Sequence, residues 1–153
     1  MRLTTFTDYS LRVLMFVAAA PEGRATIGEI ADAFAISEHH LVKVVHFLGK
    51  EGVLRNTRGR RGGLQLARPA HSINVGALVR LTEGADMPAE CFDNGTNTCA
   101  LAGGCRLQGM LKEAVESFYA ALGRYTVADL HGARGIAQLL RVDGARAAPP
   151  PRR

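Results

Sequence analysis

Residues 26–51, TIGEIADAFAISEHHLVKVVHFLGKE, constrain the fold of this chain more than any other segment. Thr26 followed three residues later by Glu29 is a capping-box signature, which predicts the start of a helix. After a short break, Ser37 can cap a second helix with an apolar face made by Leu41, Val44, Val45 and Leu48. Its opposite face carries His39, Lys43, His46 and Lys50. This pattern predicts a helix-turn-helix, although an ordinary helical hairpin with solvated Lys and His fits the segment equally well.

The residues that follow this helix pair decide between the two alternatives. Residues 53–55 and 63–66 predict two short strands around NTRGRRG, which makes a hairpin with arginines at its tip. Glycine lets such a tip turn and approach a phosphate closely, and arginine suits phosphates and the narrow minor groove. A helix-turn-helix followed at once by an Arg/Gly hairpin is typical of winged-helix DNA-binding proteins, with the wing here at about residues 53–67.

The distribution of charge supports a polyanionic partner. The formal net charge is +5, and residues 54–70 carry five arginines and no acid, whereas residues 81–105 carry four acids and no Lys or Arg. We expect the second helix to enter the major groove of double-stranded DNA with Ser37, His39, His40, Lys43 and Lys50. We expect the wing to contact phosphates or the minor groove with Arg55, Arg58, Arg60 and Arg61.

The remaining elements are predicted to be helical. Residues 7–20 form a largely buried first helix, which Thr7 or Asp8 can cap, and Asn74 can cap a helix over 75–83. A long helix over about 106–124 has a heptad seam made by Leu111, Val115, Phe118, Leu122 and Tyr125. Such a seam pairs helices, and we favour pairing with a second copy over packing on its own domain, because DNA readers of this size usually bind two half-sites as dimers.

The expected fold class is therefore mainly α with a small β-wing. Residues 1–83 form the winged helix-turn-helix region, and 84–105 form a loop. Residues 106–130 hold the dimerisation helix and a short last helix. Residues 131–153 form a tail that is partly disordered. No apolar run reaches the ~20 residues that a membrane span requires, and we expect a cytoplasmic protein whose thiols stay reduced.

All three cysteines of the chain, Cys91, Cys99 and Cys105, lie in ECFDNGTNTCALAGGC, residues 90–105. Their spacing lacks the close pairs that structural zinc sites and redox motifs use. Long gaps in a glycine-containing loop suit a larger cofactor, and soft thiolates match the iron of an iron–sulfur cluster. A four-iron cluster would need a fourth ligand from elsewhere in the molecule. Three unrelated reduced thiols are the alternative that the pattern leaves open.

The chain resembles the winged-helix iron–sulfur transcription regulators over about residues 1–130. The resemblance rests on MRLTTFTDYSLRVL at the N-terminus, the helix-turn-helix, RGRRGGLQLARPA in the wing, LTEG before the loop, the three cysteines and CRLQGMLKEA after them. The first cysteine gap also resembles an iron-responsive branch of that family. A cluster-assembly branch carries a His three residues after the last cysteine, where this chain has Gln108.

The nitric-oxide-sensing branch of the family carries an aspartate in the motif TDYSLR, and this chain has Asp8 there. The resemblance therefore implies a 4Fe–4S cluster held by Cys91, Cys99, Cys105 and the partner subunit's Asp8, with 2Fe–2S left open because spacing does not separate the two. The structural alternative for Asp8 is a helix cap or an ion pair with Arg12.

The function implied by the resemblance is that of a homodimeric repressor rather than an enzyme. It would bind a palindromic operator and release it when nitric oxide attacks the cluster. The nearest alternative is an iron- or redox-responsive regulator of the same fold. A cluster-bearing electron-transfer enzyme and a cluster-free DNA-binding module are rivals from other classes, and the helix-turn-helix and wing argue against the enzyme.

Overall fold

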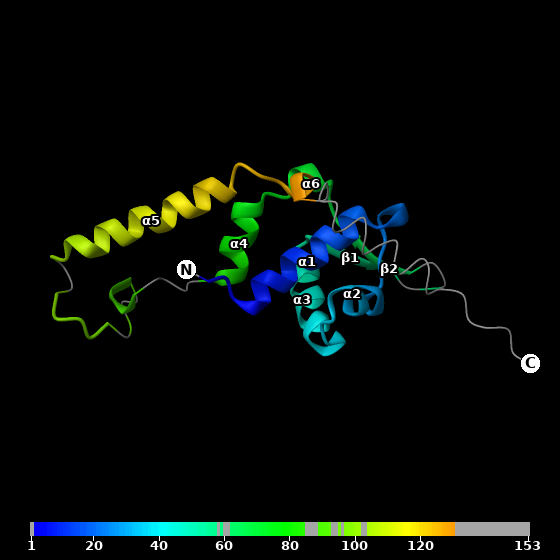
Figure 1. Ribbon diagram of the computed structural model, residues 1–153, viewed down its shortest axis with the longest axis horizontal. Coiled ribbons are helices and arrows are strands. Elements are labelled where there is room, and N and C mark those ends of the chain that lie inside the picture. The colour runs from blue at the N-terminus through cyan, green and yellow to red at the C-terminus, as the bar shows by residue number, and fades with distance from the viewer. Residues whose placement is uncertain are drawn as a thin grey trace, which may run out of the picture.

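The computed structural model describes residues 2–57, 59, 62–84, 89–92, 95, 97–101 and 104–130. Its helices are α1 (Thr5–Ala19), α2 (Ile27–Phe34), α3 (Glu38–Lys50), α4 (Val75–Glu83), α5 (Arg106–Leu122) and α6 (Val127–Leu130), and its strands are β1 (Leu54–Thr57) and β2 (Gly63–Leu66). Helices α1 to α3 and the two strands form one body, with α4 beside it (Figure 1). Helix α5 extends from this body as an arm.

Helix α1 is the centre of the core, as its apolar sequence predicts. Val13, Leu14, Phe16 and Val17 are buried, and residues of α2, α3 and the wing pack around them. The predicted cap is wrong, because α1 begins at Thr5 and its N-cap is Thr4, whose side chain accepts a hydrogen bond from the Thr7 backbone N–H. Thr7 lies inside the helix and is fully buried, and its hydroxyl donates to the Thr82 hydroxyl of α4 rather than capping α1.

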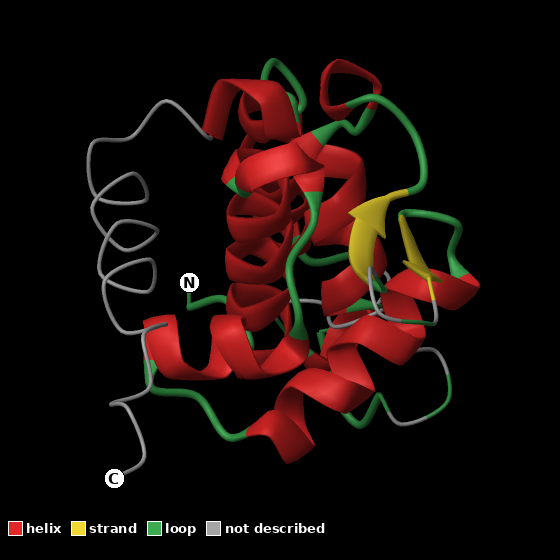
Figure 2. Cartoon of the chain, turned by 90° about the vertical axis from the view of Figure 1, so that its right-hand side faces the viewer, coloured by secondary structure: helices red, strands yellow, loops and turns green. Residues whose placement is uncertain are grey.

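The predicted helix-turn-helix, α2 and α3 in Figure 1, and the wing, whose two strands are yellow in Figure 2, are both present. Thr26 and Glu29 form the capping box of α2, and Ala35 closes the turn in the left-handed region, with a φ of 52°. Ser37 occupies the N-cap position of α3 but makes no side-chain capping hydrogen bond. Strands β1 and β2 are antiparallel, and two backbone hydrogen bonds between Ala25 and Leu64 join the hairpin to the segment before α2.

Helix α5 meets the body at α4 and at the turn after its own C-terminus. A Cβ on Gly76 of α4 would lie 2.6 Å from both the Gly123 backbone nitrogen and the Tyr119 carbonyl oxygen, so the two backbones nearly touch. Arg80 of α4 forms an ion pair with Glu116, at 2.7 Å, and its guanidinium lies 4.1 Å from the centre of the Tyr119 ring. These contacts hold the C-terminal part of α5 against α4.

The long helix is shorter than predicted, and its seam is divided. Helix α5 ends at Leu122, so Tyr125 lies beyond it and is exposed. Within α5, Val115 is buried, and three other seam residues are half-buried, namely Leu111, Phe118 and Leu122. The C-terminal part of α5 packs against α4 of the same chain, and the exposed large apolar side chains of α5, Leu107 and Met110, lie in its N-terminal part.

Candidate cluster site and nucleic-acid interface

The outward face of α3 has the character that a recognition helix requires. All the residues of this segment that the sequence assigned to the major groove are exposed, namely Ser37, His39, His40, Lys43 and Lys50. Among them lies Val42, which is 51% exposed and was not expected on this face. A methyl-bearing side chain between polar ones suits the base edges of the major groove, where thymine also presents a methyl group.

The wing places Arg55 on its exposed surface. The Arg55 Nε donates a hydrogen bond to the Gln65 side-chain oxygen across the two strands, at 3.2 Å, and this contact orients the guanidinium along the hairpin. Thr57 donates from its hydroxyl to the Gly63 carbonyl at 3.3 Å, near the tip. Arg58, Arg60 and Arg61 lie outside the described residues, so their predicted DNA contacts stay predictions.

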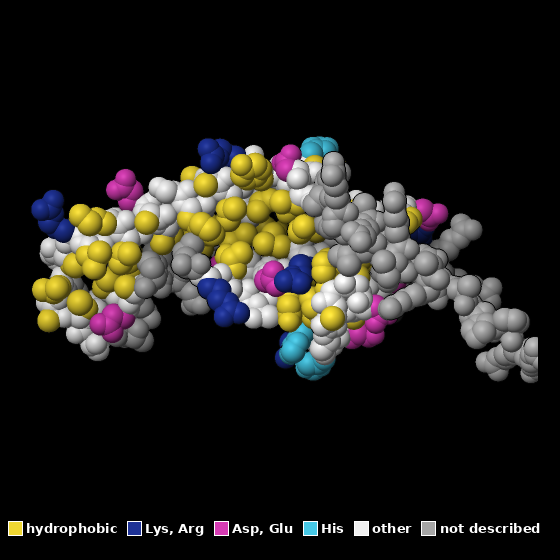
Figure 3. Space-filling view, viewed as in Figure 1, with side chains coloured by type: hydrophobic (Ala, Val, Ile, Leu, Met, Phe, Trp, Pro, Cys, Tyr) yellow, Lys and Arg dark blue, Asp and Glu magenta, His cyan; other side chains and the backbone are white. Residues whose placement is uncertain are grey.

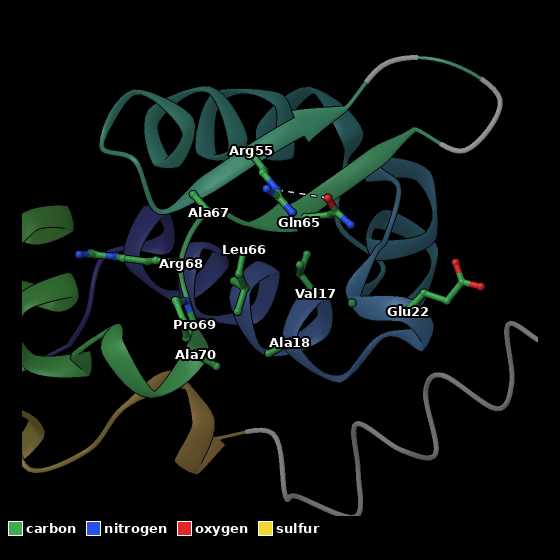
Figure 4. A pocket seen from close by; sticks show the side chains of 11 residues that line it. Val17, Ala18, Glu22, Arg55, Gln65, Leu66, Ala67, Arg68, Pro69 and Ala70 are labelled. Atoms are coloured by element: carbon green, nitrogen blue, oxygen red, sulfur yellow. Dashed lines mark hydrogen bonds between the residues drawn. The ribbon is translucent and has the colours of Figure 1, made fainter.

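A shallow groove of about 410 Å³ runs between the wing and the C-terminal half of α1 (Figure 4). Val17 and Ala18 form one side, and Arg55, Gln65 and Leu66 form another. Its charged lining residues are Glu22, Arg55 and Arg68. The groove has the form of a seam between wing and core.

The three cysteines lie between α4 and α5, and each is half-buried and free of any disulfide. Cys91 lies in a short 3-10 helix, Glu90–Phe92, and Cys105 occupies the N-cap position of α5. The Gln108 side-chain amide donates to the Cys91 carbonyl at 2.6 Å and so ties the start of the loop to the first turn of α5. The sequence interpretation noted Gln108 only as the residue in place of a histidine, and a contact between residues 17 positions apart has no local signal.

Asp8 lies in the first turn of α1, where it forms an ion pair with Arg12 at 2.9 Å. Its side chain is 44% exposed, so the carboxylate is accessible to another partner. This contact matches the structural alternative expected for Asp8 in a single chain. In the described part of the chain, no three His, Cys, Asp or Glu side chains converge on a common point that could hold a metal ion.

The chemistry of the donor set nevertheless fits an iron–sulfur cluster. Three unpaired thiols lie on one loop, and thiolates are the usual ligands of such clusters. Cys105 and Asp8 both lie at helix N-termini, where the positive end of the helix dipole favours anionic ligands. The thiols and the Asp8 carboxylate lie on separate elements of the chain.

A polar cluster between α1 and α4 was not predicted. Thr4, Thr7, Thr82 and Glu83 connect the start of α1 to the end of α4 through side-chain hydrogen bonds. The motifs MRLTTFTDYSLRVL and LTEG contain these four residues, but neither gave any indication of a partner 75 or more positions away.

A family model described as an iron-dependent transcriptional regulator, Rrf2, matches residues 3–133. The chain belongs to the Rrf2 family of transcriptional regulators. Three relatives bear the name HTH-type transcriptional regulator NsrR. They come from Geobacillus kaustophilus, at 49% identity, and from Shouchella clausii and Bacillus subtilis, each at 44%. Each match spans 85% of this chain and 88 to 90% of the relative.

Solved structures confirm the fold class of this Rrf2 regulator. Staphylococcus aureus CymR has a TM-score of 0.68 at 22% identity, covering 85% of this chain and 98% of that one. A structure described as T. potens IscR has a TM-score of 0.65 at 22% identity, covering 97% and 93%. The expected family and the winged helix-turn-helix are thus confirmed, and the protein is a DNA-binding regulator and not an enzyme. No helix in the described ranges has the length and hydropathy to cross a membrane.

Proposed function

We propose that this protein is a homodimeric cytoplasmic repressor that senses nitric oxide through an iron–sulfur cluster. The cluster, of the 4Fe–4S type, would be held by Cys91, Cys99, Cys105 and the partner subunit's Asp8. The observation that carries the proposal is the set of three unpaired, half-buried thiols on the single loop that joins α4 to α5. The identity of 43 to 49% to several regulators called NsrR supports it, because that branch is the one the TDYSLR motif resembles.

Asp8 is suited to a ligand role that ends when the signal arrives. When bound, the cluster supplies iron atoms that nitric oxide attacks. A carboxylate is a hard ligand and binds such iron more weakly than a thiolate does. Arg12 offers the released carboxylate an ion pair within the same helix, as the single chain shows at 2.9 Å. Asp8 therefore has a defined partner in each of the two states.

Helix α1 connects this carboxylate to the DNA-binding surface. Phe6 of α1 and Phe47 of α3 pack edge to face, with ring centres 5.2 Å apart, and Tyr9 lies beside His40 at 6.3 Å. A displacement of the first turns of α1 would therefore move the recognition helix. A typical coupling of 1–3 kcal/mol would change DNA affinity about 5–150-fold.

Dimerisation is supported by the apolar surface of the arm. Leu101, Leu107 and Met110 are 69%, 59% and 59% exposed, and Leu81 on α4 is 41% exposed. Figure 3 shows hydrophobic side chains gathered along the arm and continuing towards α4. A second copy that covers this surface would bring two recognition helices into one symmetric molecule, and a palindromic operator requires such a pair about one DNA turn apart.

An anaerobic titration with nitric oxide tests the proposed function. The operator is first selected from random double-stranded DNA, and cluster absorbance and operator binding are then followed in the same samples. We expect both to fall together within a few nitric oxide molecules per cluster. A coloured protein that keeps its DNA in nitric oxide but releases it on iron chelation would instead be an iron-responsive regulator.

A further inference from the structure

We propose that Thr4, Thr7, Thr82 and Glu83, here called the threonine clamp, transmit the state of the cysteine loop to the recognition helix. This inference deepens the proposed function, because it names the contact through which α1 responds to the loop. The clamp joins the last residues of α4 to the first residues of α1, and these two helix ends lie side by side (Figure 1).

The clamp is a continuous chain of hydrogen bonds. The Thr7 hydroxyl donates to the Thr82 hydroxyl oxygen at 2.8 Å, and the Thr82 hydroxyl donates to the Leu78 carbonyl at 3.1 Å. The Thr4 backbone N–H donates to the Glu83 carboxylate at 2.9 Å, and the Thr4 hydroxyl approaches the same oxygen at 3.1 Å. Each threonine hydroxyl thus donates its proton to an acceptor within the clamp or on α4. One of these residues cannot move without breaking a hydrogen bond to the next.

The burial of Thr7 makes the arrangement costly to loosen. Thr7 has no solvent exposure, so water cannot replace the acceptor that Thr82 supplies. If α4 moves relative to α1, the Thr7 hydroxyl either follows Thr82 or must turn its proton to the Thr4 hydroxyl oxygen, 3.0 Å away, which is itself held to Glu83. The end of α4 and the start of α1 should therefore move as one unit.

The clamp adjoins both halves of the candidate cluster site. Glu83 is the last residue of α4, and the chain leads from Gly84 towards Cys91. On the other helix, Asp8 follows Thr7 directly, and its backbone N–H donates to the Thr4 carbonyl at 3.0 Å. A displacement of the loop thus reaches α4 first, then the turn that holds Asp8, and then α3 through the contact of Phe6 with Phe47.

A set of threonine variants tests the clamp. Thr82→Val removes the acceptor while keeping the shape, and Thr82→Ser keeps the hydroxyl. Thr5→Val is the matched control, since Thr5 lies exposed in the same turn of α1. Operator affinity is measured for cluster-loaded and cluster-free protein, and the ratio of the two affinities reports the coupling. We expect a ratio of about 5–150 in the wild type, Thr82→Ser and Thr5→Val, and a ratio near 1 in Thr82→Val.

A second readout needs no cluster. In the cluster-free protein, Thr82→Val should speed hydrogen exchange at the Thr7 and Asp8 amides about fivefold, while Thr5→Val leaves it unchanged. A wild-type ratio retained in Thr82→Val, or unchanged exchange at these amides, would overturn the clamp. A wild-type ratio near 1 would overturn the proposed function instead, and the exchange measurement would still decide whether the clamp holds the two helices together. If Thr82→Val does not fold, Glu83→Ala takes its place in both measurements with the same expected results.

Discussion

Asp8 contributes little to the stability of the folded chain, although it is central to the proposed sensor. Its ion pair with Arg12 joins two side chains that are each more than 40% exposed, and such pairs contribute about 0–1 kcal/mol. We therefore expect Asp8→Asn to change the unfolding free energy of the cluster-free protein by less than about 1 kcal/mol. The same change should speed the loss of the cluster to an iron chelator, as followed by absorbance.

Arg12→Gln is the matched control for this experiment, because it breaks the ion pair and leaves the carboxylate in place. It should retain the cluster as well as the wild type does. Equal cluster lifetimes in Asp8→Asn and the wild type would remove Asp8 from the ligand set.

Arg55 is the described wing arginine that we expect to neutralise a phosphate. Each neutralised phosphate releases condensed counterions, so Arg55→Gln should weaken operator binding and lower the slope of log affinity against log salt by about one unit. Arg124→Gln, an exposed arginine beyond α5, should leave the slope unchanged. A slope that Arg55→Gln does not alter would show that this guanidinium does not neutralise a phosphate.

At the scale of elements, the junction of α4 and α5 depends on one glycine. A Cβ at Gly76 would meet backbone atoms of Gly123 and Tyr119 at 2.6 to 2.8 Å, and backbone cannot rotate away as a side chain can. Gly76→Ala should therefore force α5 away from α4 and destabilise the protein by about 1–3 kcal/mol in denaturant unfolding.

Gly28→Ala is the matched control, and it should stabilise the protein rather than destabilise it. Gly28 lies within α2, and the nearest atom to its added Cβ is 3.6 Å away, which is an ordinary contact. Because alanine favours a helix over glycine, this variant should gain up to about 1 kcal/mol. A neutral Gly76→Ala would mean that the two backbones separate without cost.

The same junction contains the ion pair between Arg80 and Glu116, which makes the stability of the protein depend on pH. The hydrogen bond from Arg80 lowers the pKa of Glu116 below its ordinary value of 4.5 and raises the pKa of Arg80. Because the folded pKa of Glu116 lies below the unfolded one, the stabilisation is complete above pH 4.5 and is lost as pH falls through the folded pKa. Unfolding free energies measured across this range should therefore fall more steeply for the wild type than for Glu116→Gln, and parallel curves would contradict this account.

At the scale of the whole molecule, the exposed apolar end of α5 predicts self-association. Met110→Glu would place a charge in the middle of that surface and should shift the protein towards monomer in analytical ultracentrifugation. Operator affinity should fall with it, since each subunit would then bind only one half-site.

Lys112→Glu introduces the same side chain on the opposite, polar side of α5, with a change of net charge twice as large, and should leave the dimer intact. An unchanged dimer in Met110→Glu would place the subunit interface elsewhere on the molecule.

Local rules explain why the sequence predicts most of the DNA-binding body. A capping box, a helical stripe and a glycine-flanked hairpin each depend on residues close together in the chain, so Thr26 with Glu29, the apolar face of α3 and the wing could all be recognised. The residue types of the candidate cluster site were also evident, because three thiols in one loop need no structure to be noticed.

Tertiary structure alone decided how these parts are joined. Thr7 looked like a helix cap, yet its partner Thr82 lies 75 positions away, and the Arg80 to Glu116 pair spans 36. Such contacts leave no periodic trace in the sequence, because they depend on how finished helices pack against one another. The sequence therefore determined the helices, the wing and the thiols. Packing determined that the first turn of α1 contacts both the end of α4, where the cysteine loop begins, and the recognition helix α3.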